Sequence, residues 1–138
     1  SYTQENLFKL YVFDVGILGA LAVLDPKTIR QYDYGTYKGY FAENFVAQAL
    51  TATGVERLYA WNENTAEVEF LLERGGNLVP IEVKAGHQTR SKSLAVFVKK
   101  YQPKRVLVLS ANNGKFDPDT PKNHLPLYRV EELAGVLG

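Results

Sequence analysis

The sequence contains no cysteine and no methionine, and it has two histidines. Without cysteine the chain can form neither disulfide bonds nor thiolate metal sites, and such a composition is typical of a reducing compartment. His87 and His124 are far apart in the chain, which argues against a zinc centre. Because there is no methionine, we expect the chain to be a piece of a longer protein.

The sequence also lacks long hydrophobic runs. Its longest apolar stretch, residues 16–24, is too short to cross a bilayer, and the N-terminal residues do not have the pattern of a signal peptide. We therefore expect no membrane contact and a cytoplasmic location. A length of 138 residues with 46% hydrophobic side chains predicts one folded domain over residues 1–138.

Hydrophobic periodicity predicts an α/β fold. A broad apolar stripe predicts a helix over residues 37–53, and apolar residues at helical spacing predict a second helix over residues 91–101. The continuous apolar run at residues 105–110 indicates a strand buried on both faces, which is typical of a mixed or parallel sheet. Two further strands are expected at residues 55–61 and 125–130.

Residues 66–84 are predicted to form a β-hairpin. Gly75-Gly76 is a two-residue turn signal, and it separates two segments in which apolar and polar residues alternate. A turn centred on these glycines fixes which residues face each other across the hairpin. The apolar residues are expected to pack together on one face: Val68, Phe70, Leu72, Val79, Ile81 and Val83.

Three acids and a lysine occupy the other face of this hairpin in the predicted register. Glu69 lies directly across from Glu82, and Glu67 lies across from Lys84. Opposed residues have Cβ atoms about 4.5–5.5 Å apart, so two carboxylates repel each other there unless a cation compensates. Mg²⁺ or Mn²⁺ suits such ligands, and Lys84 could orient a water or neutralise a phosphate. The alternative is the ordinary solvated face of an amphipathic hairpin.

The helical pattern of the sequence predicts the positions of two more acids. Asp14 precedes a short helix expected at residues 17–23, and it is interpreted as the cap of that helix. Glu43 has helical spacing from Val46 and Leu50, so its carboxylate is expected on the buried side of its helix. A buried carboxylate is costly unless it is paired, hydrogen-bonded or bound to metal, so a salt bridge and a metal role both remain open.

The net charge of +1 hides an uneven distribution. Residues 83–116 contain no acid and several lysines and arginines. A basic segment beside carboxylates suits a site for a metal ion and a phosphate backbone, whereas the alternative is that these side chains only solvate a helix and its loops. The candidates for nucleic-acid contact are Arg90, Lys92, Lys99 and Lys100.

The order of these elements, a helix with Glu43 followed by a hairpin with Glu69, Glu82 and Lys84, resembles the αβββαβ core of the PD-(D/E)XK nuclease-like superfamily. Glu82-Val83-Lys84 matches its E-x-K element. Over most of its length the chain also resembles an uncharacterised domain at the C-terminus of bacterial and archaeal AAA-type ATPases. The blocks that carry this second resemblance are Lys9-Leu10-Tyr11 with Asp14 and Gly16, Glu43-Asn44-Phe45-Val46, Ala66-Glu67-Val68-Glu69-Phe70, Ile81-Glu82-Val83-Lys84 and Ser91-Lys92-Ser93-Leu94.

The resemblance implies a restriction-endonuclease-like fold, with a central mixed sheet flanked by helices, that hydrolyses phosphodiester bonds of nucleic acid with Mg²⁺ or Mn²⁺. Glu69, Glu82 and the carbonyl of Val83 would hold the metal ion. Lys84 would align or activate a water, and Glu43 would complete the catalytic site. The resemblance further implies that the domain has an N-terminal ATPase domain of the same chain as a partner.

The chain departs from the superfamily pattern at Glu69, where an Asp is expected. The additional methylene displaces the carboxylate, and Mg²⁺ demands near-ideal octahedral geometry. A second function is therefore also expected from the sequence: a degenerate nuclease fold that serves as a regulatory or protein-interaction module of the ATPase. Glu67 is a substitute ligand or, in the interpretation we prefer, the partner of Lys84 in a structural ion pair.

Overall fold

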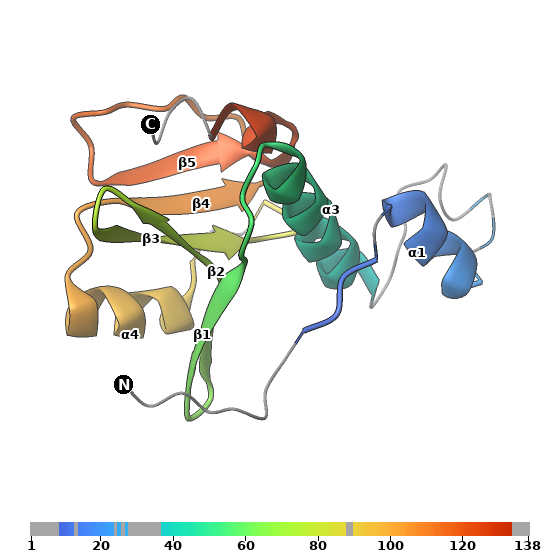
Figure 1. Cartoon of the computed structure of the whole chain (residues 1–138), viewed down its shortest axis with the longest axis horizontal. Coiled ribbons are helices and arrows are strands. Elements are labelled where there is room, and N and C mark those ends of the chain that lie inside the picture. Colours follow the sequence, from blue (N-terminus) through green and yellow to red (C-terminus); the bar gives the residue numbers. More distant parts are fainter. Residues whose placement is uncertain are drawn as a thin grey trace.

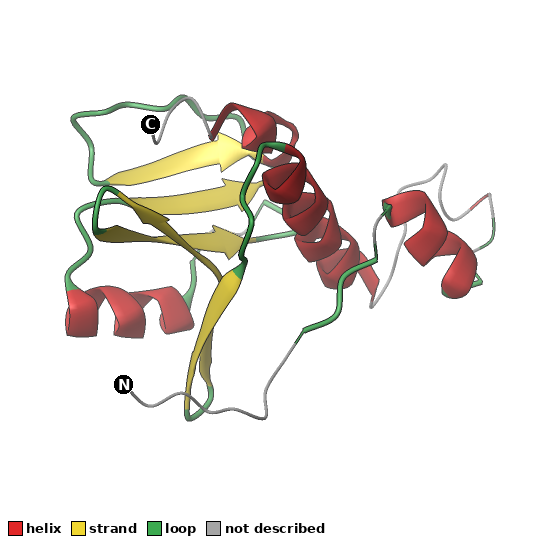
Figure 2. Cartoon of the chain, in the orientation of Figure 1, coloured by secondary structure: helices red, strands yellow, loops and turns green. Residues whose placement is uncertain are grey.

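The computed structural model describes residues 9–12, 14–23, 25, 27, 37–87 and 90–133. Within them, a five-stranded sheet carries helices on both faces (Figures 1 and 2). In chain order the elements are α1 (Val15–Leu21), α3 (Lys38–Ala52), β1 (Tyr59–Glu63), β2 (Ala66–Arg74), β3 (Asn77–Val83), α4 (Lys92–Tyr101), β4 (Val106–Ser110), β5 (Lys122–Pro126) and the 3-10 helix η2 (Leu127–Glu132). The order from α3 to β4 is the predicted αβββαβ order, and the predicted α/β class is confirmed.

The sheet is mixed, with strands in the order β1-β2-β3-β4-β5. The first three strands are antiparallel neighbours, whereas β3, β4 and β5 run parallel. Every residue of β4 is buried, as the continuous apolar run predicts for a strand covered on both faces. The carboxyl ends of the three parallel strands therefore share one edge, and β3 delivers Val83 and Lys84 to that edge.

Two hydrophobic cores lie on opposite faces of the sheet. On one face, Val46 and Leu50 of α3 pack against side chains that include Phe70 and Ile81. On the other face, α4 contributes its own buried side chains to a smaller core, and these are Leu94 and Phe97, packed against Val68, Leu71, Val106 and Val108. Because both faces are covered, the hairpin does not have one apolar and one solvated face.

The hairpin register is as predicted from Arg74 to Phe70, but the predicted pairs of Glu69 with Glu82 and of Glu67 with Lys84 are not among the pairs that the two strands form. The distribution of the side chains also differs from the prediction. β2 and β3 pair from Arg74 with Asn77 through Phe70 with Ile81, and both turn glycines have positive φ, 56° at Gly75 and 74° at Gly76. The prediction that Val68 shares a face with Phe70 is wrong, because Val68 belongs to the α4 core and Phe70 to the α3 core.

The predicted ends of two other strands are wrong by a few residues. Residues 55–61 were expected to form the strand that the structure places at Tyr59–Glu63, and the last strand runs over Lys122–Pro126 rather than residues 125–130. The first residues of β5 are polar, so no apolar pattern marks the start of this strand in the sequence. Its Asn123 is 3% exposed, and its side chain is satisfied there because Oδ1 accepts from Asp117 N (2.6 Å) and Nδ2 donates to Thr120 O (2.7 Å).

The helix ends also follow from local chemistry. Asp14 caps α1 as predicted, since its Oδ1 accepts a hydrogen bond from the amide of Gly16 (2.6 Å).

Among the helices of the described residues, none has the length and apolar composition needed to span a membrane.

Replacing Gly54 with alanine is expected to lower the free energy of unfolding by about 1 kcal/mol. Gly54 follows α3 with φ of +92°, a conformation that an L side chain rarely adopts. Gly39, inside α3, is the matched control, because a Cβ added at either glycine meets nothing within 4 Å. Gly39→Ala should leave the stability unchanged or raise it. Urea unfolding of both variants tests this, and equal effects would contradict the backbone explanation.

Candidate functional site

Glu69 lies in a β-bulge of β2. Between the pair Tyr59 with Leu71 and the pair Trp61 with Val68, β1 advances by two residues and β2 by three. The additional residue in β2 interrupts the alternation of side chains at this point. β-Bulges are frequent beside active sites, where they redirect a side chain. This bulge turns the Glu69 carboxylate toward the end of β3.

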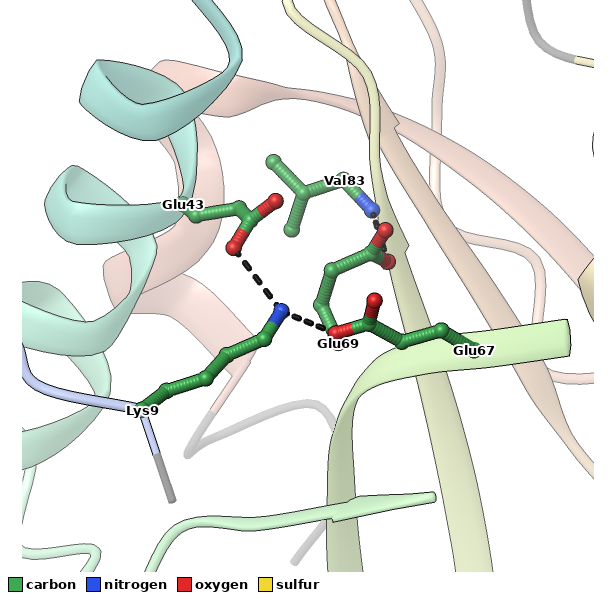
Figure 3. Close-up of polar contacts among 5 residues, drawn as sticks. All are labelled: Lys9, Glu43, Glu67, Glu69 and Val83. Atoms are coloured by element: carbon green, nitrogen blue, oxygen red, sulfur yellow. Dashed lines mark hydrogen bonds and ion pairs between the residues drawn. The ribbon is translucent and has the colours of Figure 1, made fainter. Parts of the chain in front are cut away.

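The Glu69 carboxylate contacts the main chain of β3. Its Oε2 accepts a hydrogen bond from the amide of Val83 (3.2 Å; Figure 3). In Figure 1 the first half of β2 turns away from β3 together with β1, so the two strands separate beyond the pair of Phe70 and Ile81. The carboxylate occupies this separation and satisfies the amide of Val83.

Glu82 is the most deeply buried acid among the described residues. It is 1% exposed and pairs with Val108 of β4. Since Ile81 and Val83 on either side belong to the α3 core, the Glu82 side chain points toward the α4 side of the sheet. Its Oε1 forms an ion pair with Lys84 Nζ (2.5 Å), and its Oε2 is buried without a hydrogen-bond partner among the described residues.

Burial and a neighbouring charge alter the acidity of Glu69. Burial raises the pKa of Glu69 to about 7, the charge of Glu82 adds to the increase, and the hydrogen bond from Val83 opposes it. Glu69 therefore exchanges its proton near neutral pH and has an environment that favours a neutral acid or a carboxylate compensated by a cation. Perturbed acids of this kind are characteristic of functional sites.

Glu43 approaches the cluster from α3. Its Oε2 accepts from Lys9 Nζ (3.1 Å), and the same ammonium group forms an ion pair with Oε1 of Glu67 (Figure 3). Burial alone would lower the pKa of Lys9, but its hydrogen bond to Glu67, together with the charge of Glu43 and the hydrogen bond to it, raises this pKa above its ordinary value. Lys9 therefore stays protonated and joins three elements of the chain.

The expected ion pair between Glu67 and Lys84 is wrong. Glu67 pairs with Lys9, and Lys84 pairs with Glu82. The bulge is the physical reason, because it turns the first part of β2 away from β3. The prediction that the three hairpin acids and Lys84 share one face is wrong as well, because Glu82 points to the α4 side whereas Glu67 contacts the ammonium group that also binds Glu43 of α3. The alternative of an ordinary solvated face is also wrong, since Glu82 is 1% exposed.

Lys9 is a residue of the cluster that our sequence interpretation did not single out as a site residue. A signal was present, because Lys9 is an isolated charge in the apolar and aromatic stretch of residues 7–13. Beside it, a cavity of about 750 Å³ is lined by Lys9, Glu43 and Glu67 and by aromatic side chains. The aromatic lining residues are Tyr11, Tyr37, Tyr40 and Phe41.

The donor set fits a Mg²⁺ or Mn²⁺ ion held by few protein ligands. Over the described part of the chain, no three acidic or histidine side chains converge closely enough to hold a metal ion by themselves. Mg²⁺ keeps several waters, however, and is usually bound through one or two carboxylates. Glu69 and Glu82 with the Val83 carbonyl would supply such a set, and Oε2 of Glu82 has no hydrogen-bond partner within the described part of the chain.

The four predicted nucleic-acid-binding residues lie at or near the two ends of α4. Arg90 and Lys92 are exposed where the chain leaves the end of β3 and enters α4. Lys99 and Lys100 lie in the last turn of α4, and a ten-residue helix is about 15 Å long. Lys100 is also engaged, because it forms an ion pair with Glu63 and lies over the Tyr101 ring.

Comparison with known proteins gives one match. A family model with the description "Domain of unknown function (DUF4143)" matches residues 38–129, which is more than half of the chain. No curated protein and no solved structure matches it. The matched residues include Glu43, Glu69 and Glu82. The chain therefore belongs to the family described as "Domain of unknown function (DUF4143)".

Proposed function

We propose that the domain holds a divalent metal ion with Glu69 and Glu82 and acts on the phosphodiester backbone of nucleic acid, as a member of the PD-(D/E)XK nuclease-like superfamily. The main support for the proposal is the burial of Glu82. Glu82 is 1% exposed and keeps a buried carboxylate oxygen without a partner among the described residues. A buried charge that is half satisfied is costly, and a metal ion at the end of β3 would satisfy it.

Each residue of the cluster then has a defined task. Glu69 and Glu82, with the Val83 carbonyl, would hold the ion, and a bound ion would supply Lewis acidity toward a phosphate or a water. Lys84 neutralises Glu82 through its ion pair, and its half-buried ammonium can also align a water or contact a phosphate oxygen. Glu43 approaches from the α3 side and completes the acidic surroundings.

The surroundings support a nucleic-acid substrate. The cavity beside Lys9 has aromatic walls, and unpaired bases stack on such side chains. Arg90 and Lys92 are exposed near the end of β3, where they can contact phosphates. The resemblance to C-terminal domains of AAA-type ATPases adds the proposal that an ATPase domain of the same chain is a partner and that both act in the cytoplasm.

A second candidate function is a nuclease fold without catalysis that regulates the ATPase or binds a protein. Three observations favour it: Glu69 stands in place of the expected Asp, one oxygen of each carboxylate already has a partner, and Glu43 is paired with Lys9. In this case the ion pairs are structural, and the domain keeps the fold without the reaction.

We expect Glu82→Gln to lower the rate of metal-dependent cleavage at least about a hundredfold, because the ion loses its buried ligand. Glu69→Gln should give a similar loss. The measurement is cleavage of plasmid and single-stranded DNA and of RNA with Mg²⁺ or Mn²⁺, together with Mn²⁺ binding by calorimetry. Glu73→Gln is the matched control, because Glu73 is exposed on the same strand as Glu69 and should behave as the wild type.

Cleavage that survives both substitutions would point to a contaminating nuclease and contradict the proposal. Absence of both cleavage and Mn²⁺ binding in the wild type would favour the non-catalytic function, for which deletion of the domain should alter ATPase activity while Glu82→Gln has no effect. Binding of the same nucleic acids must weaken steeply as salt rises if Arg90 and Lys92 contact phosphates.

A further inference from the structure

The cavity beside Lys9 adjoins the candidate metal site. Glu43 and Glu67 line this cavity, which has a volume of about 750 Å³, and Figure 3 shows both carboxylates in the same cluster as Glu69. Glu67 and Glu69 also belong to the same strand, with only Val68 between them. A nucleic-acid strand that places a phosphate at Glu69 therefore brings a neighbouring nucleotide to the cavity.

The walls of the cavity offer aromatic rings of two kinds. Tyr40 is 66% exposed and Tyr37 is 46% exposed, so both rings are accessible to a ligand. Tyr11 is held by the protein instead, because its ring packs against Phe70 of the α3 core with a distance of 5.7 Å between the ring centroids. A flat base stacks well on such side chains, whatever its sequence identity.

Hydrogen bonds fix the wall that Lys9 and Tyr11 provide. The side chain of Asn44 in α3 accepts from the amide of Val12 (2.7 Å) and donates to the carbonyl of the same residue (2.9 Å). One turn further along α3, the Gln48 Oε1 accepts from the amide of Val15 (3.2 Å). The segment that carries Lys9 and Tyr11 is thus attached to α3, and a wall that is ordered in advance lowers the entropic cost of binding.

The charges in the cavity decide which part of a nucleotide enters it. Glu43 and Glu67 both contact Lys9 Nζ, and together they carry more negative charge than this ammonium compensates, so the cavity disfavours a phosphate. A base is neutral and carries hydrogen-bond donors and acceptors at its edges. Burial raises the pKa of Tyr11 to about 12, so its hydroxyl keeps its proton and remains a donor for such an edge.

We infer that this cavity receives an unpaired base, so that the domain selects single-stranded nucleic acid over duplex. The inference rests on the proposed function, which places the phosphate backbone at Glu69 and Glu82. The bases of a duplex are paired and stacked, and a base that leaves the stack costs free energy that an unpaired base does not. Tyr40, the more exposed of the two accessible rings, is the residue expected to determine this specificity.

The test is the affinity of the full chain for labelled DNA, measured by fluorescence anisotropy in metal-free buffer, where the proposed reaction does not cleave the probe. The wild type should bind a single strand at least about tenfold more tightly than the duplex of the same sequence. Tyr40→Ala should weaken single-strand binding about tenfold and leave duplex binding unchanged, whereas Tyr40→Phe keeps the ring and should bind as the wild type does. Tyr59→Ala is the matched control, because Tyr59 is 50% exposed on β1 and does not line the cavity.

Equal affinities of the wild type for single strand and duplex would overturn the inference, as would equal losses in Tyr40→Ala and Tyr59→Ala. Tyr40→Ala has its own check on folding, since its duplex binding should match that of the wild type. Failure of the proposed function has a different signature: single strands are still preferred, but Mg²⁺ or Mn²⁺ produces no cleavage that depends on Glu82. A wild type that binds neither probe would overturn both.

Discussion

Replacing Lys84 with alanine is expected to lower the free energy of unfolding by about 3 kcal/mol in metal-free buffer. The substitution leaves the carboxylate of Glu82, a side chain that is 1% exposed, without its ion-pair partner. Removal of one member of a buried ion pair costs more than the pair itself contributes, because the remaining charge stays buried. Urea unfolding of the two proteins gives the difference directly.

A double-mutant cycle separates the charge from the rest of the lysine side chain. In Lys84→Ala/Glu82→Gln the buried charge of residue 82 is removed, so this protein should regain most of the stability lost in Lys84→Ala. Lys99→Ala, at an exposed position of α4, should change stability by less than about 0.5 kcal/mol. If the double variant were as unstable as the single one, the buried charge would not be the cause.

The parts of the fold that depend on local sequence could be predicted. Gly75 and Gly76 adopt the positive φ values that a tight hairpin turn requires, and that turn alone fixes the register from Arg74 to Phe70. The apolar run of β4 correctly indicated a strand covered on both faces. In each case a few consecutive residues determine the result, so no knowledge of distant contacts is needed.

The geometry of the site depends on the β-bulge of β2, which the alternation of apolar and polar residues in the sequence does not reveal. The bulge at Glu69 adds one residue to β2 relative to β1, and the pairing of β2 with β3 ends at Phe70, before Glu69, Val68 and Glu67. Phe70, Leu71 and Leu72 are all buried and still alternate between the α3 core and the α4 core, so the sequence of these residues gives no sign of the bulge. Its consequence, that Glu67 turns to Lys9 rather than to Lys84, needs contacts between residues far apart in the chain.

The stability of the metal-free protein should fall as the pH rises from about 5 to 8, and Glu69 should account for about 3 kcal/mol of the fall. Burial and the charge of Glu82 raise the pKa of Glu69 from 4.5 to about 7 in the folded chain. Between these values the folded protein binds more protons than the unfolded chain, so raising the pH favours unfolding. Above about pH 7 the carboxylate is ionised in both states, and the penalty is fully present.

Glu69→Gln isolates this contribution because glutamine has no charge to ionise and its amide oxygen can still accept from Val83. The difference in unfolding free energy between Glu69→Gln and the wild type should be small at pH 5 and should grow by about 3 kcal/mol at pH 8 in favour of the variant. Glu73→Gln, at an exposed position of the same strand, should show no such growth. A difference that stays constant with pH would mean that the Glu69 carboxylate is already compensated in the folded protein, and the case for a cation at this position would lose its electrostatic basis.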